Sequence, residues 1–247
     1  MDSSLEVDQG YKRWLRSLLV VVASFVCCAG FEEPFGVDLE RSFELIALQN
    51  EYGPKHWMPV RKWVKPVAIF LDSRAGLKDV QLQLTQEHIA NLSRITGHRI
   101  YLEHQKKNAN LILVFERESL LQPLVKELLP DQTFTDEFLN TIVCFGNFNA
   151  NRDYEITKAV VIIPTDRARA YGKLPACIVE ELTQVMGLVN DSVDVYPSIF
   201  NDKSIDDELS QHDIRLLKIL YNQNIKAGMQ RAEVMPIVRE LITKQAY

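Results

Sequence analysis

Polar side chains that could perform chemistry are concentrated in one stretch, residues 177–202, with the sequence CIVEELTQVMGLVNDSVDVYPSIFND. The candidates in this stretch are Glu180, Glu181, Gln184, Asn190 and Asp191. A carboxylate can act as a general acid or base when an enclosed pocket raises its pKa. Glu181, together with Glu180, is therefore the candidate catalytic group, and the other three residues are candidates for a polar binding cluster.

The spacing of these residues predicts a helix followed by a turn. At 100° per residue, apolar side chains gather on one side of the helix and polar groups on the opposite side. The apolar side consists of Ile178, Leu182, Val185 and Met186, and the polar side of Glu180, Gln184 and Gly187. Gly187 predicts a left-handed turn that ends the helix and brings Asn190 and Asp191 back toward its polar side.

Two interpretations of this polar cluster remain open from the sequence. In the first, its side chains form hydrogen bonds with one another or with the backbone of the SIFND turn, residues 198–202, and the network is structural. In the second, Glu181 is a general base. Because adjacent helical residues diverge by 100°, Glu180 and Glu181 are not expected to form a glycosidase-type pair that faces one substrate.

Patterns in the rest of the chain predict the elements that position this helix. Further helices are predicted for residues 38–52, 80–95, 118–129, 210–221 and 232–244. Strands are predicted for residues 64–71, 99–103, 110–115, 141–145 and 158–164. Ser210 and Asp213 have the spacing of a capping box. This order predicts an α+β fold, with a β-sheet packed on helices and a C-terminal helical part.

Composition indicates one globular domain and excludes one class of partner. The 247 residues are 47% hydrophobic and 25% charged, and they contain no internal repeat. The formal net charge of -5 leaves no basic patch that could neutralise phosphates. A nucleic-acid-binding function is therefore not expected.

The beginning of the chain predicts export. Lys12, Arg13 and Arg16 precede an apolar run over residues 17–31, which is short for a membrane span and suits a signal-peptide core. We expect residues 1–29 to be a signal peptide, or an uncleaved anchor that tethers the chain to the inner membrane through residues 17–31. Residues 30–247 are then expected to form a single domain in the cell envelope, either periplasmic or secreted.

Removal of residues 1–29 would leave only two cysteines, Cys144 and Cys177. In an oxidising compartment these two are expected to form a disulfide, which contributes roughly 3 to 4 kcal/mol on an entropic account. Two buried free thiols are the alternative.

The spacing of the polar cluster resembles the zinc-binding motif HExxHxxGxxH of the metzincin peptidases. In this register, Glu180, Gln184 and Asn190 replace the three metal-binding His. Glu181 matches the catalytic Glu, and Gly187 matches the Gly of the motif. Residues 209–222, LSQHDIRLLKILYN, resemble the segment that closes matrixin-type metzincins, whereas the Met of the expected Met-turn is absent. The resemblance implies a metzincin-like mixed sheet over the polar helix, with a degenerate metal site.

The chain is more closely similar to a bacterial family known as domain of unknown function 2927. The shared motifs are Arg61-Lys62-Trp63, EELTQ, GLVND, SIFND, LSQHD, and residues 225–232 with Gly228-Met229. These motifs are specific for membership. They imply no particular activity, because the family itself has none assigned.

The ligand set argues against zinc. Zinc sites use soft-to-borderline ligands, and one carboxylate with two neutral amides does not supply them. The five His residues show no pairwise ligand spacing, and the acidic residues 191–207 lack the spacing of a calcium loop. We expect no metal and no cofactor, and predict a non-zinc binding or assembly module with a protein or peptide partner in the envelope. The alternative is a peptidase-like hydrolase that uses Glu181 with Glu180 and Gln184.

Overall fold

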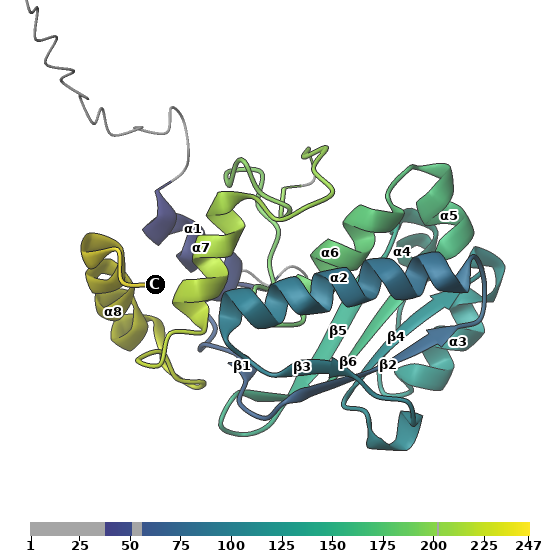
Figure 1. Ribbon diagram of the computed structural model, residues 1–247, viewed down its shortest axis with the longest axis horizontal. Helices are drawn as coiled ribbons and strands as arrows, with labels where there is room; N and C mark the ends of the chain where they lie inside the picture. Colours follow the sequence, from purple (N-terminus) through teal and green to yellow (C-terminus); the bar gives the residue numbers. More distant parts are fainter. Residues whose placement is uncertain (1–37, 51–55, 202) are drawn as a thin grey trace, which may run out of the picture. The chain divides into compact units, whose positions relative to one another are not determined.

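The computed structural model describes residues 38–50, 56–201 and 203–247, in which a mixed β-sheet carries helices on both faces (Figure 1). The strands are β1 (Lys62–Trp63), β2 (Val67–Ser73), β3 (Ile100–Leu102), β4 (Leu111–Glu116), β5 (Phe145–Ala150) and β6 (Glu155–Pro164). The α-helices are α1 (Leu39–Ala47), α2 (Lys78–Thr96), α3 (Leu121–Leu128), α4 (Asp136–Thr141), α5 (Thr165–Ala170), α6 (Leu174–Gln184), α7 (Gln211–Leu220) and α8 (Arg231–Lys244). The predicted α+β fold is confirmed.

The sheet is parallel except at one edge. Its strands follow the order β1, β6, β4, β2 and β3, and each of these pairs is parallel. β5 pairs with β6 alone, in the antiparallel direction, with Phe145 opposite Ile162. β5 is therefore an edge strand, and its outer side has no strand partner among the described residues.

Alternate side chains of the central strands enter two separate cores, because successive residues of a strand point to opposite faces of the sheet. Leu113 and Phe115 of β4 belong to the larger core with side chains of α2 and α6. Val114, between them, belongs to a smaller core with side chains of α3 and α4. Both faces of β4 are covered, which explains the uninterrupted run of apolar residues in this strand.

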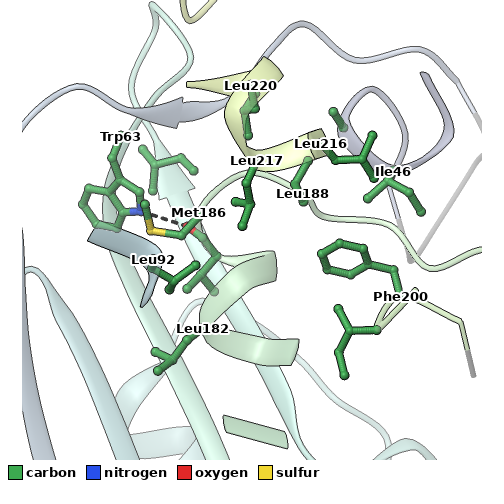
Figure 2. Close-up of a cluster of buried hydrophobic side chains, with 14 of the residues drawn as sticks. Ile46, Trp63, Leu92, Leu182, Met186, Leu188, Phe200, Leu216, Leu217 and Leu220 are labelled. Carbon is green, nitrogen blue, oxygen red and sulfur yellow. Dashed lines mark hydrogen bonds between the residues drawn. The ribbon is translucent and has the colours of Figure 1, made fainter. Parts of the chain in front are cut away.

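The segment Arg61-Lys62-Trp63 joins the end of α6 to the end of α7. Trp63 Nε1 donates a hydrogen bond to the Val185 carbonyl (2.8 Å), and Figure 2 shows the indole in the core beside Met186. Lys62 Nζ donates to the carbonyls of Leu220 (2.6 Å) and Ile225 (3.0 Å), and burial lowers its pKa to about 8. The bonds to Val185 and Leu220 satisfy carbonyls that the ends of α6 and α7 leave without a helical partner, and Ile225 lies in the loop that follows α7.

The strand predicted over residues 141–145 lies instead at Phe145–Ala150, and β1, α4 and α5 were not predicted. Residues 141–145 do not form a strand: α4 ends at Thr141, β5 begins at Phe145, and Cys144 lies in the connection between them. The hydroxyl of Thr135 accepts a hydrogen bond from the Phe138 amide (3.1 Å) and caps α4. The apolar residues that follow α4 led to the strand prediction. The two-residue strand β1 and the short helices α4 and α5 lack a long periodic pattern.

The predicted signal peptide or anchor over residues 1–29 lies outside the described residues. Within the described part of the chain, no helix has the length and apolar character needed to cross a membrane.

Candidate functional site

Helix α6 forms the floor of the candidate site and ends where the sequence predicts. Ile178 and Leu182 on its apolar side are buried in the larger core. The chain leaves the helix through a turn in which Gly187 has φ of +116°. A Cβ on Gly187 would lie 2.1 Å from the Arg61 carbonyl oxygen, so the close approach of the two backbones also requires glycine. The predicted left-handed turn is confirmed.

A pocket of about 300 Å³ opens beside α6. Its carboxylates come from Glu180, Glu181, Asp191 and Asp206. Lys173 is the basic residue in the lining, and its ammonium group donates a hydrogen bond to the Ser204 carbonyl (3.1 Å). The lining therefore carries an excess of acidic groups. We call this cavity the α6 pocket.

The structure brings four of the five candidate residues to the α6 pocket. Glu180, Glu181, Gln184 and Asp191 all line it, although Glu180 and Glu181 are adjacent on the helix. Asn190 is not part of the lining. It is buried, and its amide donates a hydrogen bond to the Leu45 carbonyl of α1 (3.0 Å). Asn190 therefore holds the turn against α1 and does not face the pocket.

Gln184 and Asp191 are linked directly. The Gln184 amide donates a hydrogen bond of 2.8 Å to Asp191 Oδ1, which joins the last turn of α6 to the segment after Gly187. The backbone amides of Val189 and Asn190 both donate to the Ile46 carbonyl, at 2.9 and 3.1 Å. The turn is thus fixed both by side-chain and by backbone hydrogen bonds.

Strand β5 approaches the carboxylate of Glu181 closely. A Cβ on Gly146 would lie 3.0 Å from Glu181 Oε2 and 2.8 Å from Val185 Cγ1. Glu181 is 5% exposed, and α6 packs directly against β5. The sequence analysis missed Gly146, although a glycine inside a strand is a known signal of close backbone approach.

A disulfide forms one wall of the α6 pocket. Cys144, just before β5, is bonded to Cys177 in α6, and both residues line the cavity. The disulfide was one of the two alternatives predicted for this pair. It ties the edge of the sheet to the helix that carries Glu180 and Glu181.

Asp213 of α7 holds another part of the pocket lining in place. Its carboxylate accepts hydrogen bonds from the Ser198 hydroxyl (2.6 Å), the Ile199 amide (3.0 Å) and the Ser210 hydroxyl (2.8 Å). The predicted capping box is also confirmed: the Asp213 amide donates to the Ser210 hydroxyl (3.1 Å), and the Ser210 amide donates to the Asp213 carboxylate (2.9 Å). Burial raises the pKa of Asp213, against the effect of these hydrogen bonds. Asp213 therefore connects the SIFND and LSQHD motifs. Its bond to the Ile199 amide fixes the position of Ile199, which lines the α6 pocket.

The described residues contain no group of three or more His, Cys, Asp or Glu arranged to hold a metal ion. His212 is buried in α7 and does not line the α6 pocket. His88 is buried against α6, with its Nε2 3.0 Å from the Thr183 hydroxyl, and burial lowers its pKa to about 4. Both imidazoles pack within the protein and stand apart from the pocket carboxylates.

Comparison with known proteins identifies the family of this chain. A family model described as "Protein of unknown function (DUF2927)" matches residues 37–240. No curated protein matches the chain. The matched range includes the α6 pocket and the segments that form its walls.

Proposed function

We propose, from the premise that this chain belongs to the DUF2927 family of proteins of unknown function, that it is an exported cell-envelope protein whose α6 pocket binds a protein or peptide partner. The chain would act as a binding or assembly module that works without zinc. The single observation that carries this proposal is the hydrogen bond between Gln184 and Asp191, because it occupies a side chain at a metal-ligand position with another protein group.

A metzincin-like scaffold is the second part of the proposal. It is supported by a mixed sheet packed on the helix that carries the HExxHxxGxxH spacing. Gln184 and Asn190, which stand in place of two metal-binding His, both donate hydrogen bonds within the protein. On this proposal, the hydrogen bonds that Gln184 and Asn190 donate to Asp191 and to the Leu45 carbonyl preserve the geometry of the turn that a metal would otherwise organise.

The edge strand suggests how a partner would bind. The outer side of β5, which has no strand partner in the described ranges, can pair with an extended segment of another chain, a common mode of peptide recognition. The α6 pocket is lined by the segment that leads into β5 and by α6, and its lining carries, among the described residues, four carboxylates against the single ammonium group of Lys173. A basic side chain of the added segment would therefore be favoured in the pocket by charge complementarity.

Export is proposed from the sequence of residues 12–31, basic and then apolar. A reporter enzyme that is active only outside the cytoplasm, fused after Gly30, should be active in cells. An inactive fusion recovered from the cytosol would contradict export. Fractionation of the full chain would separate a cleaved protein from one tethered through residues 17–31.

Peptide binding is tested with labelled extended peptides that differ only in carrying basic, neutral or acidic side chains. We expect basic peptides to bind most tightly, and Glu180→Lys to weaken their binding about tenfold, since it replaces attraction by repulsion in a partly enclosed site. Asp153→Lys, on an exposed turn outside the pocket lining, makes the same charge change and should leave binding unaltered. Equal effects of the two variants would contradict the pocket as the binding site.

A hydrolase is the second candidate, because Glu181 is buried and lines the pocket. A general base at this position predicts that Glu181→Gln keeps the fold and abolishes hydrolysis. Metal analysis of protein purified without chelators separates the two candidates further. Stoichiometric metal, or hydrolysis lost only in Glu181→Gln, would favour the enzyme over the binding module.

A further inference from the structure

Arg61 lines a second cavity, which has a volume of about 260 Å³ and shares only Gln184 with the α6 pocket. We call it the Arg61 cavity. Its polar lining includes the side chains of Asn50 and Asn147. Its apolar lining includes Phe148 of β5 and two valines that follow α6, Val185 and Val189.

Arg61 is a buried cation whose contacts are neutral. One Nη atom donates to Asn50 Oδ1 (2.5 Å) and the other to the Gln49 carbonyl (2.8 Å), and the guanidinium lies 5.8 Å from the centre of the Phe148 ring. The residue is 6% exposed, and its Nε has no hydrogen-bond partner in the described part of the chain.

No carboxylate compensates this charge within the described residues. The acidic residues of the ion pairs found there bond other cations and not Arg61. They include Glu44, Asp72, Glu118 and Glu127. A buried charge without a counter-ion is costly, and burial accordingly lowers the pKa of Arg61 to about 10. Among the described residues, Arg61 thus has no acidic partner, and a negative charge on a bound molecule would supply one.

We propose that the Arg61 cavity binds a carboxylate carried by a molecule with an apolar group next to it. The guanidinium fork suits a planar carboxylate, and Arg61 Nε supplies an unused donor. Asn50 accepts from Arg61 through its oxygen, which leaves its amide donors for the ligand. Phe148, Val185 and Val189 would contact the apolar group.

A single guanidinium selects a monoanion over a dianion. One carboxylate neutralises Arg61, whereas a phosphate dianion would leave an extra negative charge in a lining whose described residues include no second cation and in which the Gln184 amide already bonds the Asp191 carboxylate. The C-terminal carboxylate of a peptide with an apolar last residue has the required chemistry. This inference stands apart from the function proposed for the α6 pocket, because its ligand is recognised by Arg61 and not by the pocket carboxylates.

Titration calorimetry on the purified full chain tests the proposal with N-acetyl-leucine, its amide, acetate and inorganic phosphate. We expect N-acetyl-leucine to bind with a Kd on the order of 1 mM and the uncharged amide at least tenfold more weakly. Acetate, without the apolar group, should also bind more weakly. Comparable binding of the amide, tighter binding of phosphate, or no binding of N-acetyl-leucine at about 50 mM would overturn the proposal.

Two variants place the binding in this cavity. Arg61→Gln removes the cation, but it also breaks the bonds to Gln49 and Asn50 and so can disturb the fold. Asn147→Asp instead adds a negative charge to the lining and should weaken binding of N-acetyl-leucine about tenfold. Asn149→Asp adds the same charge two residues along β5, outside the lining, and should change the Kd less than twofold. Equal effects of the two aspartates would refute the location.

Discussion

Replacing Gly187 by alanine should be among the most destabilising single-methyl additions in this chain. The new Cβ would lie 2.1 Å from the Arg61 carbonyl oxygen and 3.2 Å from Leu220 Cδ2. The backbone at position 187 has φ of +116°, where a side chain costs roughly 1 to 2 kcal/mol in addition. Relief of the overlap requires a backbone shift, which costs about 1 to 3 kcal/mol as in other overpacked sites.

The shift would also lengthen hydrogen bonds next to Gly187. Trp63 bonds the Val185 carbonyl, and the Tyr221 hydroxyl bonds the Met186 carbonyl at 2.9 Å, each worth about 1 kcal/mol. Together these effects should lower the free energy of unfolding by about 4 kcal/mol. For a chain of this size, that loss lowers Tm by about 8 to 16 °C. Urea denaturation at constant pH measures the free energy of unfolding.

Gly97→Ala is the matched control. Gly97 ends α2 with φ of +65°, but a Cβ there meets no atom within 4 Å. Its substitution should therefore cost about 1 kcal/mol, from backbone strain alone. A loss for Gly187→Ala within about 1 kcal/mol of the loss for Gly97→Ala would refute the argument, because overlap with the Arg61 carbonyl would then have no measurable cost.

Three further predictions concern stability. Cys144→Ala opens a loop of 33 residues closed by the bond to Cys177, and should lower the free energy of unfolding by about 4 kcal/mol; an unchanged urea midpoint under oxidising conditions would contradict it. The pKa of His88 is about 4 in the folded state against 6.5 unfolded, so the unfolded chain binds more protons between these values, and stability present above pH 6.5 falls by about 3 kcal/mol as the pH drops to 4. In His88→Gln this acid-induced loss should shrink by that amount, and an identical pH profile would refute the assignment. Gln184→Ala and Asp191→Ala should each destabilise the fold, with a coupling of about 1 kcal/mol in the double variant; strictly additive losses would show that their hydrogen bond contributes nothing.

Much of the fold followed from local patterns in the sequence. The helix over residues 80–95 was predicted close to the observed α2, because it has a long apolar period and ends at Gly97. The capping box of Ser210 and Asp213 and the turn at Gly187 are also local signals, and both are confirmed. The strand β1 could not be predicted, because its two residues gain their structure from pairing with β6, about 90 positions away along the chain.

The candidate site was predictable only in part, for the same reason. Helical spacing placed Gln184 near the turn, but whether Asn190 faced the pocket or α1 depended on contacts with Leu45, far along the chain. The buried environment of Arg61 is a property of the packed structure, since a charged residue before a short strand is ordinarily exposed. Periodicity reports which residues share a face, and it does not report which long-range neighbour covers that face.

The carboxylate of Asp213 serves two structures that are usually independent. It accepts a hydrogen bond from the Ser210 amide at the start of α7, and it also accepts from the Ser198 hydroxyl and from the amide of Ile199, which lines the α6 pocket. Fraying of this helix end and opening of the pocket wall therefore both break hydrogen bonds to the same carboxylate, so we expect them to occur as one cooperative event. In native-state hydrogen exchange, the amides of Ile199 and Asp213 would share one opening free energy, and a ligand that immobilised the wall would slow exchange in α7 without touching it.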